Sequence, residues 1–402
     1  MPRRPFRPIL AVSPRRRLPL RRRPGLLRAW ETPGVDRRVG QAEGQYSRAG
    51  ESHRRELTPA SRRSYHRRTR WRSVFLFVST VGRWSQYREA RPQVVQKLVI
   101  DADPGVGDAL AIVLALQDPD VEVVALTPVA GRVSGLVASR NIQSVVDCLD
   151  PSRRPRIGHS SATSPALRPP VNLDGPSGLG DWDVPVVGLH HRHESARLLV
   201  EIVRSQPHEI TVLTLGPLTN VGLAAEMAAD FFGLVGHLVC LGGAVGGGGD
   251  VTAAAEYNVM ASVETARQVL VSSANKTLVP LDVSGRLMLS PDQFRRLRSR
   301  VSGSIAELLD GWFPHWFRTH HESLGIEGVV LHAVAALASV TQPRLFRRQD
   351  MQVDVEVVGQ LTRGMTVFDR RREMGAPANI EVCVDVDEQG VVDYLSKVLA
   401  GG

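Results

Sequence analysis

From Gln96 onward, short apolar runs alternate with polar turns and with longer segments whose apolar residues recur at helical spacing. The β-branched run over 97–100 predicts a strand, Pro104 and Gly105 interrupt it, and 109–116 predicts a helix. Such alternation is typical of an α/β fold, with a mostly parallel central sheet flanked by helices. Further strands are predicted over 121–126, 209–215, 238–241 and 277–283, and further helices over 135–149, 194–205, 218–229, 262–273 and 291–309.

Three carboxylates, Asp101, Asp103 and Asp108, accompany the first strand-to-helix turn. Turns of this kind line the carboxyl edge of a parallel sheet, where open α/β folds bind ligands. Because crowded carboxylates repel one another unless a cation neutralises them, and because the donors are all oxygens, the cluster predicts a site for Ca²⁺ or Mg²⁺.

Two other interpretations of this turn stay open. Acidic residues after a strand are often helix N-caps, which suits Asp108 but not the two earlier acids. A phosphotransferase of the haloacid dehalogenase type also opens with strand-Asp-x-Asp and uses the first Asp as nucleophile. That type usually has Thr or Val where this chain has Gly105, and no matching downstream lysine and acidic pair is evident.

The charge is divided unevenly along the chain. Residues 1–90 contain 23 basic and 6 acidic residues, whereas the remainder contains 27 and 35. The arginine runs of the first part alternate with Pro, Ser and Gly and show no apolar period, so residues 1–91 are predicted to be a disordered basic arm in front of one domain over 92–402. Such an arm can bind nucleic acid or an anionic membrane, but an incidental tail is favoured because aromatic residues are sparse and no nucleic-acid module follows.

Several features bound the environment of the protein. The apolar stretch 74–81 is too short to span a bilayer, so a cytoplasmic protein is expected. Cys148, Cys240 and Cys383 are far apart within apolar segments and are predicted to be reduced core residues.

Three loop segments contain residue types that can serve in ligand binding or catalysis. The Pro/Gly/Ser-rich segment 152–183 is long enough to be a functional lid. The Gly-rich segment 242–249 lacks the Gly-Lys-Ser/Thr ending of a phosphate cradle. His190, His191 and His193 lie in a polar segment without a spaced partner, so solvated histidines are favoured over a transition-metal site.

Several blocks of the chain, in the same order, resemble the inosine-uridine-preferring nucleoside hydrolase family. The run from Asp101 to Ala109, Asp-Ala-Asp-Pro-Gly-Val-Gly-Asp-Ala, resembles the signature Asp-x-Asp-x-Gly-x-Asp-Asp-Ala. Leu215-Gly-Pro-Leu-Thr-Asn220 is similar to Thr-Gly-Pro-Leu-Thr-Asn of the family. The other matching blocks are Val129-Ala-Gly131 with Arg140-Asn141, Leu241-Gly-Gly-Ala244, Ala255-Glu-Tyr-Asn258, Leu281-Asp-Val-Ser284, Leu331-His332 and Thr362-Arg-Gly-Met-Thr366.

The resemblance implies a Rossmann-like core and a hydrolase that cuts the N-glycosidic bond of a ribonucleoside with a Ca²⁺-activated water. By position, Asp103 would bind Ca²⁺ and act as general base, and Asp108 would be a bidentate ligand. Leu215 would offer its backbone carbonyl to the metal, and Asp101 would support the cluster. Glycosidic cleavage passes through an oxocarbenium-like state, which suits an activated water on one side and help for the departing base on the other.

The same resemblance implies the residues that contact substrate. Glu256 and Asn258 would hydrogen-bond the ribose hydroxyls, with Asn141 in support near the metal. His332 would protonate or polarise the leaving base, a role that suits an imidazole. The ligand would be a small nucleoside, and a homo-oligomer is implied because family members commonly form dimers or tetramers.

Four positions depart from the family pattern. Gly107 stands where the family has a second adjacent Asp that contacts ribose, and Ala333 stands where an Asp ligates Ca²⁺. Asp174 stands near a position of the long loop where family members often have His. Arg132 replaces the Asn that follows Ala-Gly, which leads to the hypothesis that Arg132 binds an anionic group on the substrate. Since Ca²⁺ affinity follows ligand charge and number, the metal site is expected to be weakened. The alternative function is therefore a degenerate homologue that binds a ribose-containing ligand without turnover.

Overall fold

A computed structural model describes residues 95–401, apart from 165, 184–192, 247 and 372–376. The predicted basic arm over 1–91, the apolar stretch 74–81 and two of the three loop histidines, His190 and His191, lie outside the described residues. The described residues belong to one compact unit, Arg83–Gly402.

A nine-stranded sheet organises the fold, in the order β10-β9-β11-β6-β5-β4-β1-β2-β3. From β11 to β3 in this order, each strand pairs in parallel with the next. The two remaining pairs, β11 with β9 and β9 with β10, are antiparallel. The mostly parallel sheet is thus confirmed. The strands are β1 Gln96–Ala102, β2 Val121–Pro128, β3 Arg156–Ile157, β4 Thr211–Thr214, β5 His237–Leu241, β6 Lys276–Val279, β9 Phe346–Val355, β10 Thr366–Asp369 and β11 Ile380–Val386, and β7 Met288–Leu289 pairs separately with β8 Val329–Val330.

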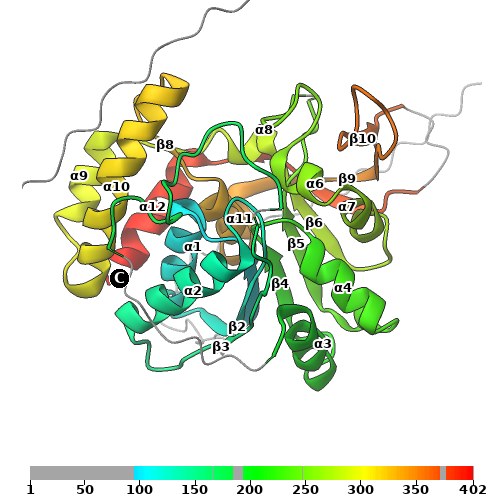
Figure 1. The fold of residues 1–402 in the computed structure, drawn as a ribbon, viewed down its shortest axis with the longest axis horizontal. Coiled ribbons are helices and arrows are strands. Elements are labelled where there is room, and N and C mark those ends of the chain that lie inside the picture. The colour runs from blue at the N-terminus through cyan, green and yellow to red at the C-terminus, as the bar shows by residue number, and fades with distance from the viewer. Residues whose placement is uncertain (1–94, 165, 184–192, 247, 372–376, 402) are drawn as a thin grey trace, which may run out of the picture. The chain divides into compact units, whose positions relative to one another are not determined.

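Helices cover both faces of this sheet (Figure 1). Along β1, Leu98 and Ile100 join one apolar core with α1, α10, α11 and α12, whereas Val99 joins another with α3, α4 and α7. The strand is apolar on both sides because both of its faces are buried. The helices are α1 Val106–Gln117, α2 Gly135–Leu149, α3 Ser195–Ser205, α4 Thr219–Met227, α5 Phe231–Leu234, α6 Tyr257–Ala261, α7 Val263–Leu270, α8 Leu281–Ser284, α9 Pro291–Arg298, α10 Gly303–Leu324, α11 His332–Thr341 and α12 Glu388–Leu399, with a 3₁₀ turn at Pro343–Leu345.

The order of β3, β2, β1, β4, β5 and β6 is that of a doubly wound Rossmann-like sheet. The chain winds outward from β1 in both directions, so the strand order reverses between β1 and β4. Open α/β sheets bind ligands at the carboxyl ends of the strands beside this reversal. The candidate carboxylates follow β1 and therefore lie where the topology favours a site.

Three predictions about elements were wrong in detail. The predicted helix 291–309 is two helices, because the chain leaves helical geometry after α9 and Gly303 begins α10 with a left-handed φ of 64°. The predicted strand 277–283 ends at Val279, since Pro280 precedes the short helix α8. The segment 152–183 is not entirely a loop, because β3 within it pairs with β2.

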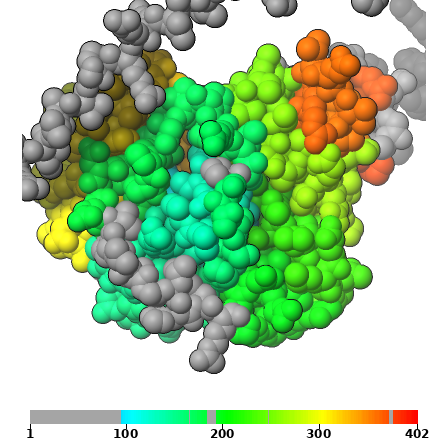
Figure 2. Space-filling view, viewed as in Figure 1, coloured from blue at the N-terminus to red at the C-terminus, as the bar shows by residue number. Residues whose placement is uncertain are grey.

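The antiparallel segment β9–β10 forms one edge of the sheet. Figure 2 shows its last part, in orange, at the surface beside the yellow-green chain that contains α6 and α7. No helix in the described part of the chain combines the length and apolar character that crossing a membrane requires. Cys148, Cys240 and Cys383 are all free; Cys240 and Cys383 are buried core residues as predicted, whereas Cys148 is only half-buried.

Candidate active site

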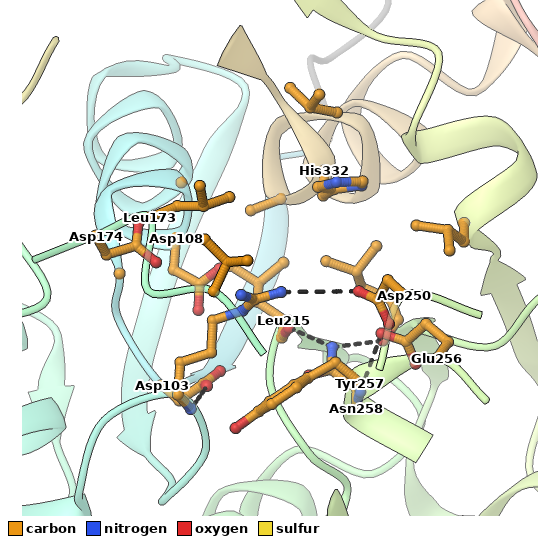
Figure 3. Close-up of a pocket in the computed structure, with 18 of the residues that line it drawn as sticks. Asp103, Asp108, Leu173, Asp174, Leu215, Asp250, Glu256, Tyr257, Asn258 and His332 are labelled. Carbon is orange, nitrogen blue, oxygen red and sulfur yellow. Dashed lines mark hydrogen bonds and ion pairs between the residues drawn. The ribbon is translucent and has the colours of Figure 1, made fainter. Parts of the chain in front are cut away.

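A cavity of about 230 Å³ opens at the carboxyl ends of β1, β4 and β5. It is smaller than the ~300–1,000 Å³ typical of sites for drug-sized ligands, which favours a small ligand. Figure 3 shows acidic side chains at several points around it, with His332 on the opposite side from Asp103. The polar lining residues are Asp103, Asp108, Arg132, Asp174, Asp250, Glu256, Tyr257, Asn258, His320 and His332.

Asp103 lies in a cradle of backbone. Its Oδ2 accepts a hydrogen bond from the N–H of Arg132 at 2.5 Å. A Cβ at either Gly131 or Gly216 would overlap this carboxylate, so both loops approach it only because they carry glycine there. Burial raises the pKa of Asp103 to about 7, against the opposing effects of the Arg132 N–H and guanidinium. The signature block at Asp103 and the Gly-Pro-Leu-Thr-Asn block thus meet at one carboxylate.

Two further acids lie at the start of α1. Asp108 belongs to its first turn and is not the N-cap, which is Gly105. Asp174, from the long loop, accepts a hydrogen bond from the N–H of Val106 at 3.0 Å, so it caps the helix from outside. Gly105 admits it, because a Cβ there would lie 2.6 Å from the Asp174 carboxyl. Burial raises the pKa of both Asp108 and Asp174. The loop expected to serve as a lid therefore sends an acid into the site.

Asp101 lies beneath the cavity and does not line it. Its Oδ1 accepts hydrogen bonds from Thr127 Oγ1 at 2.6 Å and from Asn220 Nδ2 at 2.7 Å. Its Oδ2 is buried with no hydrogen-bond partner among the described residues. Burial raises the pKa of Asp101 to about 7. Asp101 thereby connects β1 to β2 and to α4, which fits the supporting role expected of it.

Glu256 and Asn258 form a further part of the cavity wall. Glu256 is the N-cap of α6, where its carboxylate accepts from the N–H groups of Asn258 and Val259, and its Oε2 also accepts from Gly243 N–H. Asn258 Nδ2 donates to the carbonyl oxygens of Leu215 at 2.7 Å and Leu241 at 3.0 Å. Burial raises the pKa of Glu256 to about 7. Both side chains line the cavity, where they can meet ligand hydroxyls.

His332 faces the cavity from the start of α11. Its Nδ1 lies 3.0 Å from Ser284 Oγ, within hydrogen-bond distance. If the hydroxyl donates, Nε2 carries the proton and is left to bond a ligand. Burial lowers the pKa of His332 to about 4, with a further contribution from Arg132. The imidazole is therefore neutral near pH 7. Ala333, the next residue, also lines the cavity and offers no side-chain donor.

Asn141 has a positioning part in this structure. Its Nδ2 donates to the carbonyl oxygens of Pro104 and Ser177, at 3.0 and 2.9 Å. It is 1% exposed and is absent from the cavity lining. It therefore holds the acidic turn against the long loop and does not itself reach the cavity.

Arg132, Tyr257, Asp250 and Trp316 complete the site, and the sequence motifs assigned no role to Tyr257 or Asp250. Arg132 Nη2 lies 3.8 Å from Asp250 Oδ2, and its Cζ lies 4.7 Å from the centroid of the Tyr257 ring. Tyr257 stands inside the Ala-Glu-Tyr-Asn block, the one signal that pointed to it, whereas Asp250 has none. Trp316 lines the cavity over Gly107, while its helical neighbour Trp312 is fully buried against Trp182. Of these two tryptophans of α10, only Trp316 lines the cavity.

The Gly-rich segment is occupied by internal hydrogen bonds. Asp282 accepts from Val245 and Gly246 N–H, and Thr366 Oγ1 accepts from Ala244 N–H. These N–H groups are thus unavailable to phosphate, in agreement with the sequence analysis. His193, the one described histidine of its segment, is exposed, as favoured for a solvated residue.

The residues present do not make a complete Ca²⁺ site. Within the described ranges, no group of three histidine, cysteine or acidic side chains is arranged so that it could hold a metal ion. Asp103, Asp108 and the Leu215 carbonyl are suitable oxygen donors, but Ala333 adds none and Arg132 brings a positive charge close to the acids. We therefore assign no chemical step to a metal.

Known proteins are similar to this chain in both sequence and fold. The family model described as inosine-uridine preferring nucleoside hydrolase matches residues 98–393. The pyrimidine-specific ribonucleoside hydrolase RihA of Escherichia coli O9:H4 (strain HS) is 34% identical over 311 residues, which cover 75% of this chain and 97% of that enzyme. A plant nucleoside hydrolase, PpNRh1, superimposes with a TM-score of 0.69 at 26% identity, covering 77% of this chain and all of that one. An inosine-guanosine nucleoside hydrolase gives a TM-score of 0.68 at 26% identity, covering 76% and 99%.

Proposed function

Because the chain belongs to the inosine-uridine-preferring nucleoside hydrolase family, we propose that it hydrolyses the N-glycosidic bond of ribonucleosides, releasing the free base and ribose. The observation that carries this proposal is the position of Asp103 and His332 on opposite sides of one small cavity, with Glu256 and Asn258 along its wall (Figure 3). A nucleoside held at its sugar by that wall has room for water on one side and for its base near the histidine.

In the proposed reaction Asp103 is the general base. A water molecule beside its carboxylate attacks C1′ of the ribose and loses a proton to Asp103. The C1′–N bond breaks, and its electron pair leaves with the base. Asp103 is held for this task by the Arg132 N–H and by close backbone at Gly131 and Gly216, so its carboxylate does not rotate away from the cavity.

His332 helps the base to depart. With Nδ1 held by Ser284, Nε2–H donates a hydrogen bond to the base as negative charge develops on it. The base leaves as an anion held by this hydrogen bond and takes up a proton from solvent, while Asp103 returns the proton of the attacking water to solvent, so the products are the neutral base and ribose. Because burial keeps the imidazole neutral near pH 7, its contribution is hydrogen bonding to the leaving group and not a resident positive charge.

Calcium activation stays a prediction for this chain. Asp103, Asp108 and the Leu215 carbonyl are the donors that would hold the ion, and their small number makes weak binding the expected outcome.

The alternative, a homologue that binds a ribose-containing ligand without turnover, is favoured by the absence of a side-chain donor at Gly107 and Ala333. The deciding experiment measures reducing-sugar release by the full chain from uridine, cytidine, inosine and guanosine, with Ca²⁺ and with EDTA. Asp103→Asn is the control, since it keeps the size of the side chain but removes the base. Release that Asp103→Asn abolishes supports the hydrolase. Binding of the same nucleosides in calorimetry, without any release, establishes the alternative.

A further inference from the structure

The cavity contains a strong imbalance of formal charge. Five acidic residues line it, namely Asp103, Asp108, Asp174, Asp250 and Glu256, and Arg132 is the one lysine or arginine among the described lining residues. The two lining histidines do not make up the difference, because burial lowers the pKa of both His320 and His332. Any cation that enters this cavity therefore meets the acids with Arg132 already among them.

Arg132 is held where its charge reaches the acids. Its own N–H donates to Asp103, its guanidinium lies 3.8 Å from Asp250, and the Tyr257 ring lies beneath it with the cation 4.7 Å from the centroid. A guanidinium over an aromatic ring is attracted by the ring quadrupole. About a third of the Arg132 side chain remains exposed, so the group is anchored without being sealed in.

The charge of Arg132 interacts with acids from three separate segments. Although burial alone would lower the pKa of Arg132, the carboxylates of Asp174, Asp103 and Asp250 outweigh it and raise that pKa. In turn, the guanidinium opposes the rise that burial imposes on the pKa of Asp103 and Asp174. The guanidinium thus shares one cavity with Asp103 of the turn, Asp174 of the long loop and Asp250, which follows the Gly-rich segment.

Three of the residues that line the cavity work against a metal ion. Gly107 and Ala333 contribute no side-chain oxygen, whereas Arg132 contributes a guanidinium. A Ca²⁺ ion that entered here would meet a positive charge already close to its oxygen donors. We infer that Arg132 is a built-in cation of this site, which neutralises its carboxylates in place of a divalent metal and weakens the binding of Ca²⁺.

The inference concerns the same cavity as the proposed function, but it does not depend on turnover. Metal affinity and stability measure it directly, whereas reducing-sugar release measures the hydrolase. An inactive protein can still confirm a built-in cation, and an active one can still refute it.

The test is Ca²⁺ titration by calorimetry, together with thermal unfolding in EDTA and in Ca²⁺, on full-length wild type, Arg132→Gln and Arg132→Lys. The glutamine variant removes the charge at similar length, and the lysine variant keeps the charge without the planar fork. We expect weak Ca²⁺ binding by wild type and by Arg132→Lys, and at least tenfold tighter binding by Arg132→Gln. We also expect Arg132→Gln to melt lower than wild type in EDTA and to be restored by Ca²⁺.

Two results would overturn the inference: micromolar Ca²⁺ binding by wild type, or equal Ca²⁺ affinities of Arg132→Gln and Arg132→Lys. Should Arg132→Gln not fold even with Ca²⁺, Ala333→Asp decides in its place. We expect Ala333→Asp to bind Ca²⁺ weakly, because the guanidinium of Arg132 remains beside the added carboxylate. Micromolar binding by Ala333→Asp, with Arg132 present, would show that a missing ligand and not a resident cation had weakened the site.

Discussion

Asp101 offers a direct test of how this site is supported, because it is fully buried and outside the cavity. Replacing it with alanine removes the acceptor of two buried donors, Thr127 Oγ1 and Asn220 Nδ2. A buried donor left without its acceptor costs about 1–3 kcal/mol, and Asp101→Ala leaves two, so it is expected to lower the free energy of unfolding by about 3 kcal/mol.

Asparagine at the same position keeps an acceptor for both donors but cannot ionise. The folded-state pKa of Asp101, about 7, lies above its ordinary value of 3.8. The carboxyl group is therefore favoured in its protonated form by the folded protein. Its stabilising effect is complete below about pH 4 and is lost as the pH rises through about 7. Over that interval, wild type should lose roughly 4 kcal/mol relative to Asp101→Asn, at 1.36 kcal/mol per pKa unit.

The assay is urea unfolding of wild type, Asp101→Asn and Asp101→Ala between pH 4.5 and 8. The other buried acids are present in all three proteins, so their titration largely cancels in the differences. Asp101→Asn should gain on wild type steadily with rising pH. A difference between these two proteins that does not change with pH would refute the reasoning, because it would show that Asp101 is ionised in the folded state throughout this range.

Three further predictions concern the cavity. Gly216→Ala places a methyl group against both the Asp103 carboxylate and Val129, so kcat should fall at least tenfold and the melting temperature should fall as well, measured by steady-state kinetics beside thermal unfolding. Ser284→Ala frees His332 Nδ1, so kcat should fall about tenfold on uridine but less on p-nitrophenyl riboside, whose leaving group departs without proton assistance; equal losses would contradict the leaving-group role. Glu256→Gln should raise KM more than it lowers kcat, because a sugar contact is weakened, and should cost about 1 kcal/mol of stability at the N-cap in urea unfolding.

Local patterns predicted the elements best where the sequence carried its own boundary signals. The helix over 135–149 was predicted with its observed bounds, because Ser134 caps it, Val137 N–H bonds to that serine, and Asp150 ends it in a left-handed conformation. The prediction of one helix over 291–309 was wrong, because the apolar periodicity continues across the break between α9 and α10. The antiparallel edge was not predicted, since β9 pairs with β10 across the long loop 356–365 and with β11 beyond it, so no two-residue hairpin turn marks the pairing.

The site was predictable to the extent that motif blocks contain it. Asp103, Asp108, Leu215, Glu256, Asn258 and His332 all reach one cavity, because the blocks follow strands or begin helices at the same sheet edge. Asn141 was expected near the substrate and instead holds the acidic turn. Asp250 could not be found from sequence, because it meets the cavity only through packing between segments far apart in the chain.

The departures Gly107, Ala333 and Arg132 are distant in sequence, yet all three line the same cavity. The position without a side chain at 107 is covered by the Trp316 ring, which lies 3.5 Å from where a Cβ would stand. An apolar ring thus occupies the neighbourhood of a missing carboxylate, and a guanidinium supplies positive charge to those that remain. Groups that share a cavity and its charge do not contribute independently. The three positions therefore act together on how this fold balances its buried carboxylates.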